Sequence, residues 1–243
     1  MKKILFLVVF AISSNFLNAQ SKLRLSPNIK LGYPSVFQGT PDEFSTIKGA
    51  TSTTSGVFLA SLGGDLMYQF NEKIGLQVGV NLSVAQYNQN FDGFRWGTDW
   101  DPVAGILHKS ITKFQLTLVQ INTPIIVKYF ASSKISYNLG VIPQFILSKK
   151  ASSKIEYIDN WKPALNNGTV QYPLRKFNPA FYAGVSFYPK LTSKTQLEVS
   201  PYAQINMFAD DLYLYYAKNR FYQVGVSIGI QKAPAAKPQF KKR

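Results

Sequence analysis

An apolar residue at every second position is the feature that most restricts how this chain can fold. Successive side chains of a β-strand point to opposite faces, whereas a helix places its apolar residues three and four apart. In the clearest segment, six aliphatic residues alternate with glycine, alanine or polar residues: Ile74, Leu76, Val78, Val80, Leu82 and Val84. This segment predicts a strand with one apolar face and one polar face.

The same alternation recurs along the chain and predicts eight strands. Besides residues 74–84, the clear segments are 58–70, 135–141, 181–187, 197–207 and 222–230, and the weaker ones are 23–33 and 114–130. The short connections are 71–73, 131–133 and 189–193, and the long ones are 34–55, 91–110, 149–176 and 209–220. Outer-membrane barrels have an even strand number, short periplasmic turns and long outer loops. We therefore predict an all-β fold, an eight-stranded antiparallel up-and-down transmembrane β-barrel with short periplasmic turns and long extracellular loops.

The first 19 residues have the composition of a secretory signal peptide. Lys2 and Lys3 precede an apolar run over residues 4–12, and Ala19 supplies the small residue before a cleavage site. The run is too short to cross a bilayer as a helix. We expect residues 1–19 to be removed, residues 20–231 to form the barrel in the outer membrane of a Gram-negative bacterium, and the basic, proline-containing residues 232–243 to be disordered in the periplasm.

Composition removes several kinds of chemistry. The chain has no Cys, which excludes disulfides, thiolate chemistry and Cys-based metal sites. Its single His removes most imidazole chemistry. The net charge is +15 and becomes +13 once Lys2 and Lys3 leave. An exported membrane protein rarely meets nucleic acid, so we expect no nucleic-acid partner. Outer-membrane lipid and the phosphates of lipopolysaccharide are the nearer partners for basic residues at the outer rim.

Aromatic residues make up 14% of the chain and suit the girdles of a membrane barrel. One girdle is expected near the short turns and another near the long loops. The first set is Tyr68, Phe70, Tyr129, Phe130, Phe187 and Tyr188, and the second is Tyr33, Tyr87 and Phe114.

Two features depart from a regular barrel pattern. Pro27, Pro143, Pro179 and Pro201 all fall inside predicted strands. Each removes a ladder donor, so some should mark bulges or strand ends. In residues 114–130 the apolar positions also change phase, from Phe114, Leu116 and Leu118 to Ile121, Ile125, Val127 and Tyr129. This change predicts a bulge near Val119 or Gln120.

A soluble lipocalin-like or sandwich fold is the main alternative. Such a protein turns its polar face to water and needs charges there. In this chain the polar positions of the strands are mostly Gly, Ser, Asn and Gln, while the loops carry most of the charge. Small uncharged side chains suit a narrow lumen better, which favours the membrane barrel.

A family resemblance appears at the fourth and fifth strands. Residues 121–129 read INTPIIVKY, followed by LGV at 139–141 and FILSKK at 145–150. These segments resemble the PorT-like outer-membrane β-barrel domain of Bacteroidetes. The proline, Lys128 and Tyr129 match, whereas Asn122 stands where an acidic residue is usual and Thr123 where an aliphatic residue is usual. The resemblance implies a fold and a location, and it transfers no functional residues.

Four charged residues are expected to point into the lumen. They are Lys30, Asp65, Lys128 and Glu198. Charges inside a small barrel are costly unless they are paired, which predicts a structural charge network. An ion path is the functional alternative, although the interior of an eight-stranded barrel is only wide enough for side chains to fill it.

The second long loop is the other candidate site. It carries four large aromatic residues, Phe91, Phe94, Trp96 and Trp100, which we call the contact loop. Exposed aromatic rings need cover. Either the rings plug the barrel mouth or dip into the outer leaflet, or they form a contact patch for a protein or glycan partner.

No catalytic, cofactor or metal site emerges from the sequence. His108 lies near Asp101 and Ser110, but a triad is recognised by geometry and not by proximity in sequence. The acidic pairs in the loops follow no calcium-binding spacing. We predict a non-enzymatic barrel with a structural or binding role. The alternatives are an accessory component of a secretion or gliding apparatus, type IX-like, and a rim hydrolase acting on lipid A.

The barrel hypothesis makes a direct prediction. The mature chain should fractionate with outer membranes, and it should migrate differently on a denaturing gel with and without boiling, because a closed barrel resists detergent until it is heated. Recovery as a soluble periplasmic protein would contradict the barrel.

Overall fold

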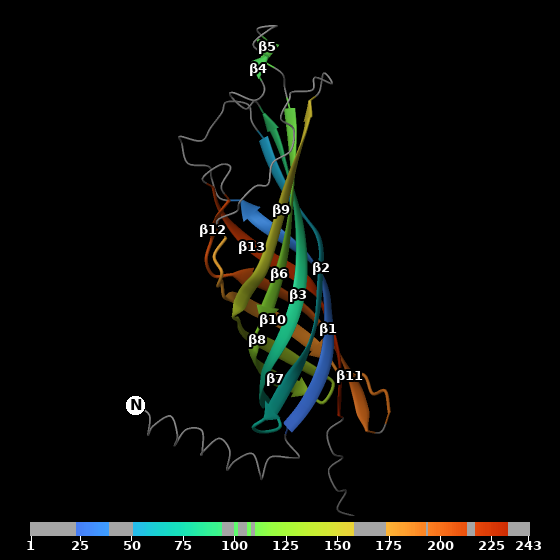
Figure 1. The fold of residues 1–243 in the computed structure, drawn as a ribbon. Helices are drawn as coiled ribbons and strands as arrows, with labels where there is room; N and C mark the ends of the chain where they lie inside the picture. Colours follow the sequence, from blue (N-terminus) through green and yellow to red (C-terminus); the bar gives the residue numbers. More distant parts are fainter. Residues whose placement is uncertain are drawn as a thin grey trace, which may run out of the picture.

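The computed structural model describes residues 23–38, 51–93, 100–101, 106–107, 110–157, 174–192, 194–212 and 217–232. Residues 1–19 of the predicted signal peptide, and all of the predicted tail except Lys232, lie outside these ranges. Within them the regular elements are β-strands (Figure 1). The described residues include no helix that is long and apolar enough to span a bilayer.

Eight antiparallel strands close into a barrel, as predicted. The ring is formed by β1 (Leu23–Gln38), β2 (Thr51–Gln69), β3 (Ile74–Gly93), β7 (Ile125–Ser132), β8 (Ile135–Ile142), β10 (Ala180–Phe187), β11 (Thr195–Asn206) and β13 (Ala217–Lys232), and β13 pairs with β1 to close it. The remaining elements are β4 (Trp100–Asp101), β5 (Ile106–Leu107), β6 (Ser110–Asn122), β9 (Gln144–Tyr157) and β12 (Asp210–Leu212). Closure removes sheet edges, which a bilayer does not tolerate.

Two of the eight wall strands are interrupted by proline. β6 and β7 are halves of one strand separated by Thr123 and Pro124, and β8 and β9 are halves of the next strand separated by Pro143. The two breaks lie side by side, because Thr123 N donates to Pro143 O at 2.9 Å. Pro143 and Pro179 therefore lie at strand ends, whereas Pro27 and Pro201 stay within β1 and β11.

The lower part of the wall has an apolar outer face and a polar inner face. Along β3 the aliphatic residues from Ile74 to Val84 point outward. At about 3.3 Å per residue and a tilt near 40°, these positions cover about 25 Å along the barrel axis, which is the height of a lipid-facing band. The inward positions of β3 at this level are Gly75, Gln77, Gly79, Asn81 and Ser83.

Above this band the polarity of the wall reverses. On β3 the outward positions become Gln86 and Asn88, while Tyr87 points inward and is buried. On β6 the inward residues Leu116 and Leu118 are likewise buried. Polar-out and apolar-in is the arrangement of a β-sheet in water. We call these two parts the lipid-facing part and the water-facing part of the barrel.

The reversal corrects the predicted phase change. Burial alternates without interruption through β6 and β7, so that Leu118, Gln120, Asn122 and Ile126 all point inward. The register shift does lie between Val119 and Gln120, but the unpaired residue is on the neighbouring strand β9. The sequence pattern changes because the environment of each face changes, and not because the strand turns over.

The aromatic girdles are also only partly as predicted. Adjacent residues of a strand point to opposite sides. Tyr129 and Phe187 face outward, whereas their neighbours Phe130 and Tyr188 are buried inside, with ring centroids 5.9 Å apart. Near the long loops Tyr33 faces outward, but Tyr87 and Phe114 belong to the apolar filling of the upper lumen.

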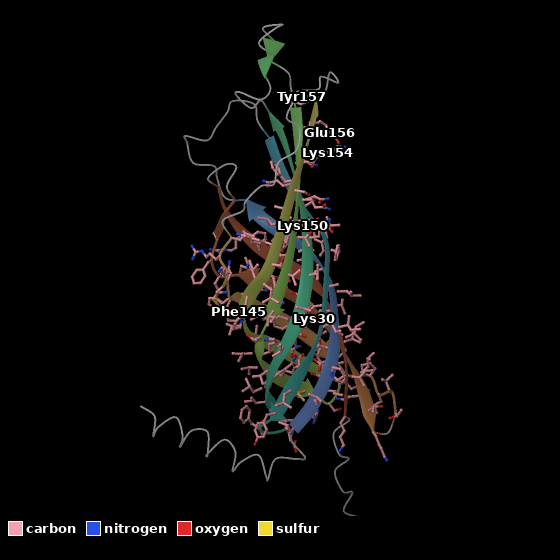
Figure 2. All side chains as sticks on the ribbon, viewed as in Figure 1. Lys30, Phe145, Lys150, Lys154, Glu156 and Tyr157 are labelled. Atoms are coloured by element: carbon pink, nitrogen blue, oxygen red, sulfur yellow. The ribbon has the colours of Figure 1, made fainter. Side chains whose placement is uncertain are left out.

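The water-facing part is formed mainly by four strands of the barrel sheet. β2, β3, β6 and β9 continue upward together, while β1 and β13 leave on the other side (Figure 1). On β9, Phe145 lies at the level of the barrel wall and Lys150, Lys154 and Tyr157 follow higher up (Figure 2). Lys113 Nζ of β6 donates to Glu156 of β9 at 2.6 Å, and this hydrogen bond lowers the pKa of the exposed Glu156 carboxyl.

β1 and β2 separate at a contact between a proline and a glycine. Their described pairing ends at Gly32 and Leu59. Above it, the buried Pro34 of β1 packs against Gly56 of β2, where an added Cβ atom would lie 1.4 Å from Pro34 O. Only a residue without a side chain allows this approach.

This contact predicts different effects for two glycines of the same strand. Gly56→Ala should destabilise the refolded barrel by about 1–3 kcal/mol, because the strands must shift to admit the methyl group. Gly64→Ala is the control, since no atom lies within 4 Å of its added Cβ. Urea unfolding midpoints in detergent measure both. Equal midpoints for the two variants would show that the strands separate freely at this point.

Candidate functional site

The lower lumen contains a buried ion pair between β7 and β11. The Lys128 ammonium, in a residue only 1% exposed, donates to Glu198 Oε1. Ser186 Oγ and Ser200 Oγ donate to the same oxygen at 2.8 and 3.1 Å, and Gln231 Nε2 donates to Oε2 at 3.2 Å. A buried ion pair needs partners for its remaining lone pairs. Here β10, β11 and β13 supply them.

The second carboxylate of the predicted network is held by amides instead of by an ammonium. Asp65 Oδ2 accepts hydrogen bonds from Asn28 Nδ2 at 2.7 Å and from Gln77 Nε2 at 2.6 Å. Lys30 is 8% exposed and points into the same space. Within the described residues, Lys30 makes no direct ion pair with Asp65. Lys128 thus pairs with Glu198, one of the two carboxylates of the predicted network.

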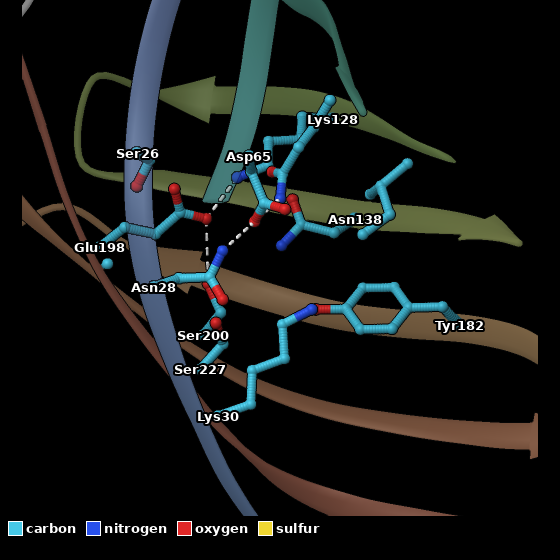
Figure 3. A pocket seen from close by; sticks show the side chains of 13 residues that line it. Ser26, Asn28, Lys30, Asp65, Lys128, Asn138, Tyr182, Glu198, Ser200 and Ser227 are labelled. Carbon is cyan, nitrogen blue, oxygen red and sulfur yellow. Dashed lines mark hydrogen bonds and ion pairs between the residues drawn. The ribbon is translucent and has the colours of Figure 1, made fainter. Parts of the chain in front are cut away.

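All four predicted lumen charges surround one small polar cavity. It is lined by Lys30, Asp65, Lys128 and Glu198, which come from β1, β2, β7 and β11 (Figure 3). The cavity has a volume of about 10 Å³, which is room for about one water molecule. Side chains therefore fill the lumen at this level.

Sequence reasoning missed two members of this network. Arg24 is buried and its Nη2 donates to Gln69 Oε1 at 2.7 Å. Tyr188 OH lies 3.4 Å from Lys128 Nζ and 2.8 Å from Ser136 Oγ. Arg24 precedes Lys30 by six positions in the same strand, and this even spacing places both side chains on one face. The sequence pattern could therefore have identified Arg24.

A second, apolar layer closes the lumen above the charges. It belongs to a buried cluster with members from every wall strand and from the residues before β10. The layer includes Val36, Leu59, Tyr87, Phe114, Leu116, Leu118, Leu174 and Phe221. Tyr87 and Phe221 meet edge to face, with centroids 5.0 Å apart. The apolar layer and the charge network together leave the described lumen without a wide passage.

The contact loop lies mostly outside the described residues. Phe94 and Trp96 are not described, and Phe91 and Trp100 are described only through their backbone, in β3 and β4. His108 also lies outside. Among the residues that the structure covers, no group of three or more His, Asp or Glu side chains could hold a metal ion.

The geometry of the described residues defines a class of protein, the small closed β-barrel with a lipid-facing belt. No family model and no curated protein matches the chain. The PorT-like resemblance therefore stays a prediction from its motif.

Solved structures of small barrels are similar to this chain. OprG, an outer membrane protein of Pseudomonas aeruginosa, has a TM-score of 0.43 and 10% identity, over 86% of this chain and 94% of OprG. Neisserial surface protein A has a TM-score of 0.40 and 12% identity, over 86% and 96%. Ail of Yersinia pestis has a TM-score of 0.34 and 14% identity, over 85% and 97%. We transfer no functional residue from these proteins.

The ion pair predicts a strong asymmetry between single and double variants. Lys128→Met should destabilise the barrel by about 3–5 kcal/mol, because it leaves the Glu198 carboxylate buried and unpaired. Adding Glu198→Gln should recover a large part of this loss. Lys190→Met, at an exposed turn position, is the control. Unfolding free energies in detergent test the set, and additive losses in the double variant would exclude a direct pair.

Proposed function

We propose that this chain is a non-enzymatic outer-membrane barrel that presents a binding surface on its long extracellular loops. The supporting observation is the reversal of wall polarity. β3 and β6 stay paired up to Gly93 and Ser110, nine residues beyond Val84, which is about 30 Å further along the strand. A water-exposed sheet that extends this far beyond the lipid-facing part can hold the extracellular loops within reach of a partner.

The filled lumen favours display over transport. Lys128, Glu198 and their partners occupy the lipid-facing part, and an apolar layer occupies the water-facing part. A solute would have to displace a buried ion pair to pass. A packed lumen makes the barrel a rigid base for its loops. Sites carried on rigid elements are held more accurately than sites on mobile elements.

The partner class that we propose is a protein or a glycan. The contact loop connects β3 to β6, whose pairing at Gly93 and Ser110 is the last described pair of the raised sheet. Trp and Arg are the residues most enriched at binding hot spots, and this loop contains Trp96, Trp100 and Arg95. The accessory role in a secretion or gliding apparatus rests on the PorT-like resemblance alone.

Replacing Trp96 and Trp100 by Ala tests the contact loop. If the rings form a contact patch, the purified variant should keep its thermal stability and lose the protein or glycan that co-purifies with the wild type. If they plug the barrel or anchor in the leaflet, thermal stability should fall. Trp161→Ala is the matched control, because Trp161 is the third tryptophan of the chain and belongs to another long loop. A variant that loses neither property would contradict both accounts.

A further inference from the structure

A short segment before β10 is fixed against the outer end of the barrel wall. Leu174 and Asn178 are buried at its two ends. Ile146 N of β9 donates to Lys176 O at 2.8 Å, and Asn178 N donates to Gln144 O at 3.1 Å. The backbone of residues 174–178 is therefore tied to the start of β9, while the side chains of Arg175 and Lys176 remain exposed.

Aromatic rings lie directly beside these cations. Phe145 of β9 and Phe177 pack with their centroids 4.9 Å apart, and both stay nearly half exposed on the outer surface. The Arg175 guanidinium lies over the Phe208 ring at 5.2 Å. Asn178 bonds to both the N–H and the carbonyl of Phe208, at 3.3 and 3.1 Å. These contacts hold Phe208 in place and thereby fix the height of Arg175.

The height of this group matches the upper border of the lipid-facing part. On β9 the outward residues are Phe145, Leu147 and Ser148 and then, beyond the register shift at Leu147, Lys150, which pairs with the outward Thr117 of β6. The change from the apolar Leu147 to the basic Lys150 takes three residues, about 10 Å of strand. Lys150, Arg175 and Lys176 thus stand above exposed apolar side chains on two neighbouring wall segments. Aromatic side chains are enriched at this level of a bilayer.

We propose that Lys150, Arg175 and Lys176 bind the phosphate groups of a phosphorylated glycolipid of the outer leaflet, of the lipid A type. This inference rests on the proposed outer-membrane location, and it adds a defined lipid site to it. Arginine and lysine make strong charge-assisted hydrogen bonds to phosphate. Phe145, Phe177 and Leu147 offer the acyl chains of the same molecule an apolar surface directly below.

The arrangement favours a lipid over a soluble anion. A free phosphate would gain nothing from the aromatic rings beneath the cations. A diphosphorylated glycolipid with several acyl chains meets both halves of the surface at once. The long loops place this end of the barrel outside the cell, where the leaflet is built from such glycolipids.

The test uses the full mature chain, refolded and reconstituted in nanodiscs of neutral phospholipid. Diphosphoryl lipid A, monophosphoryl lipid A, phosphatidylglycerol and inorganic phosphate are titrated separately, and bound lipid is counted by native mass spectrometry. The rim variant carries Lys150→Gln, Arg175→Gln and Lys176→Gln. The matched control carries Lys134→Gln, Lys190→Gln and Lys194→Gln, three exposed cations at the short-turn end.

We expect the wild type to bind diphosphoryl lipid A most tightly, the rim variant to bind it at least tenfold more weakly, and the control to stay within twofold of the wild type. Equal weakening in both variants, or no weakening in the rim variant, would overturn the site. Equal affinity for phosphatidylglycerol or for inorganic phosphate would overturn the ligand class.

Folding and location are checked apart from binding. Heat-dependent gel migration must be the same for all variants. If the loss of Arg175 prevents folding, the variant with only Lys150→Gln and Lys176→Gln replaces it, and we expect at least a threefold loss, because both of these side chains are exposed. A chain that is soluble without detergent would instead contradict the proposed membrane location, which separates that failure from failure of the lipid site.

Discussion

The constraint on which the rest of the structure depends is that backbone N–H and C=O groups have no water to bond to within a bilayer. A sheet meets this requirement only by closing on itself. The pairing of β13 with β1 completes the ring, and every other property of the lipid-facing part follows from it. With the outside given over to lipid, all polar side chains of these strands must point inward, where they can only satisfy one another. The ion pair of Lys128 and Glu198 and the amide bonds to Asp65 are the result.

A second environment begins where the lipid ends, and β3 and β6 pass into it without turning over. Side chains that point outward change from aliphatic to amide at Gln86 on β3, and side chains that point inward change from polar to apolar at Leu118 on β6. One continuous sheet is thus a membrane barrel below and a water-exposed sheet with an apolar inner face above. Tyr87 and Phe114 are buried in the upper lumen and belong to the hydrophobic core of this second part.

The sequence predicted the lipid-facing part well because alternation with aliphatic residues on one face admits few other folds. It predicted the water-facing part poorly, because alternation by itself does not say which face is inside. Phe114 and Leu118 were assigned to the wrong environment for this reason, and a phase change was inferred where none exists. The choice between Asp65 and Glu198 as the partner of Lys128 was equally out of reach. It depends on which strands face one another across the lumen, and no spacing along the chain encodes this.

The reversal of polarity also sets the depth at which the molecule can sit. Sinking by one pair of residues would carry the amide side chains of Gln86 and Asn88 into hydrocarbon, and rising by the same amount would expose Leu76 or Ile74 to water at the lower border. Both movements raise the free energy of the molecule in the membrane. The free energy therefore has a narrow minimum at one depth along the membrane normal. A pull on the outer loops would then be resisted by the whole circumference of the belt. The resistance of the eight strands to this pull depends on how sharply the outward side chains change from aliphatic to polar, and not on any single contact.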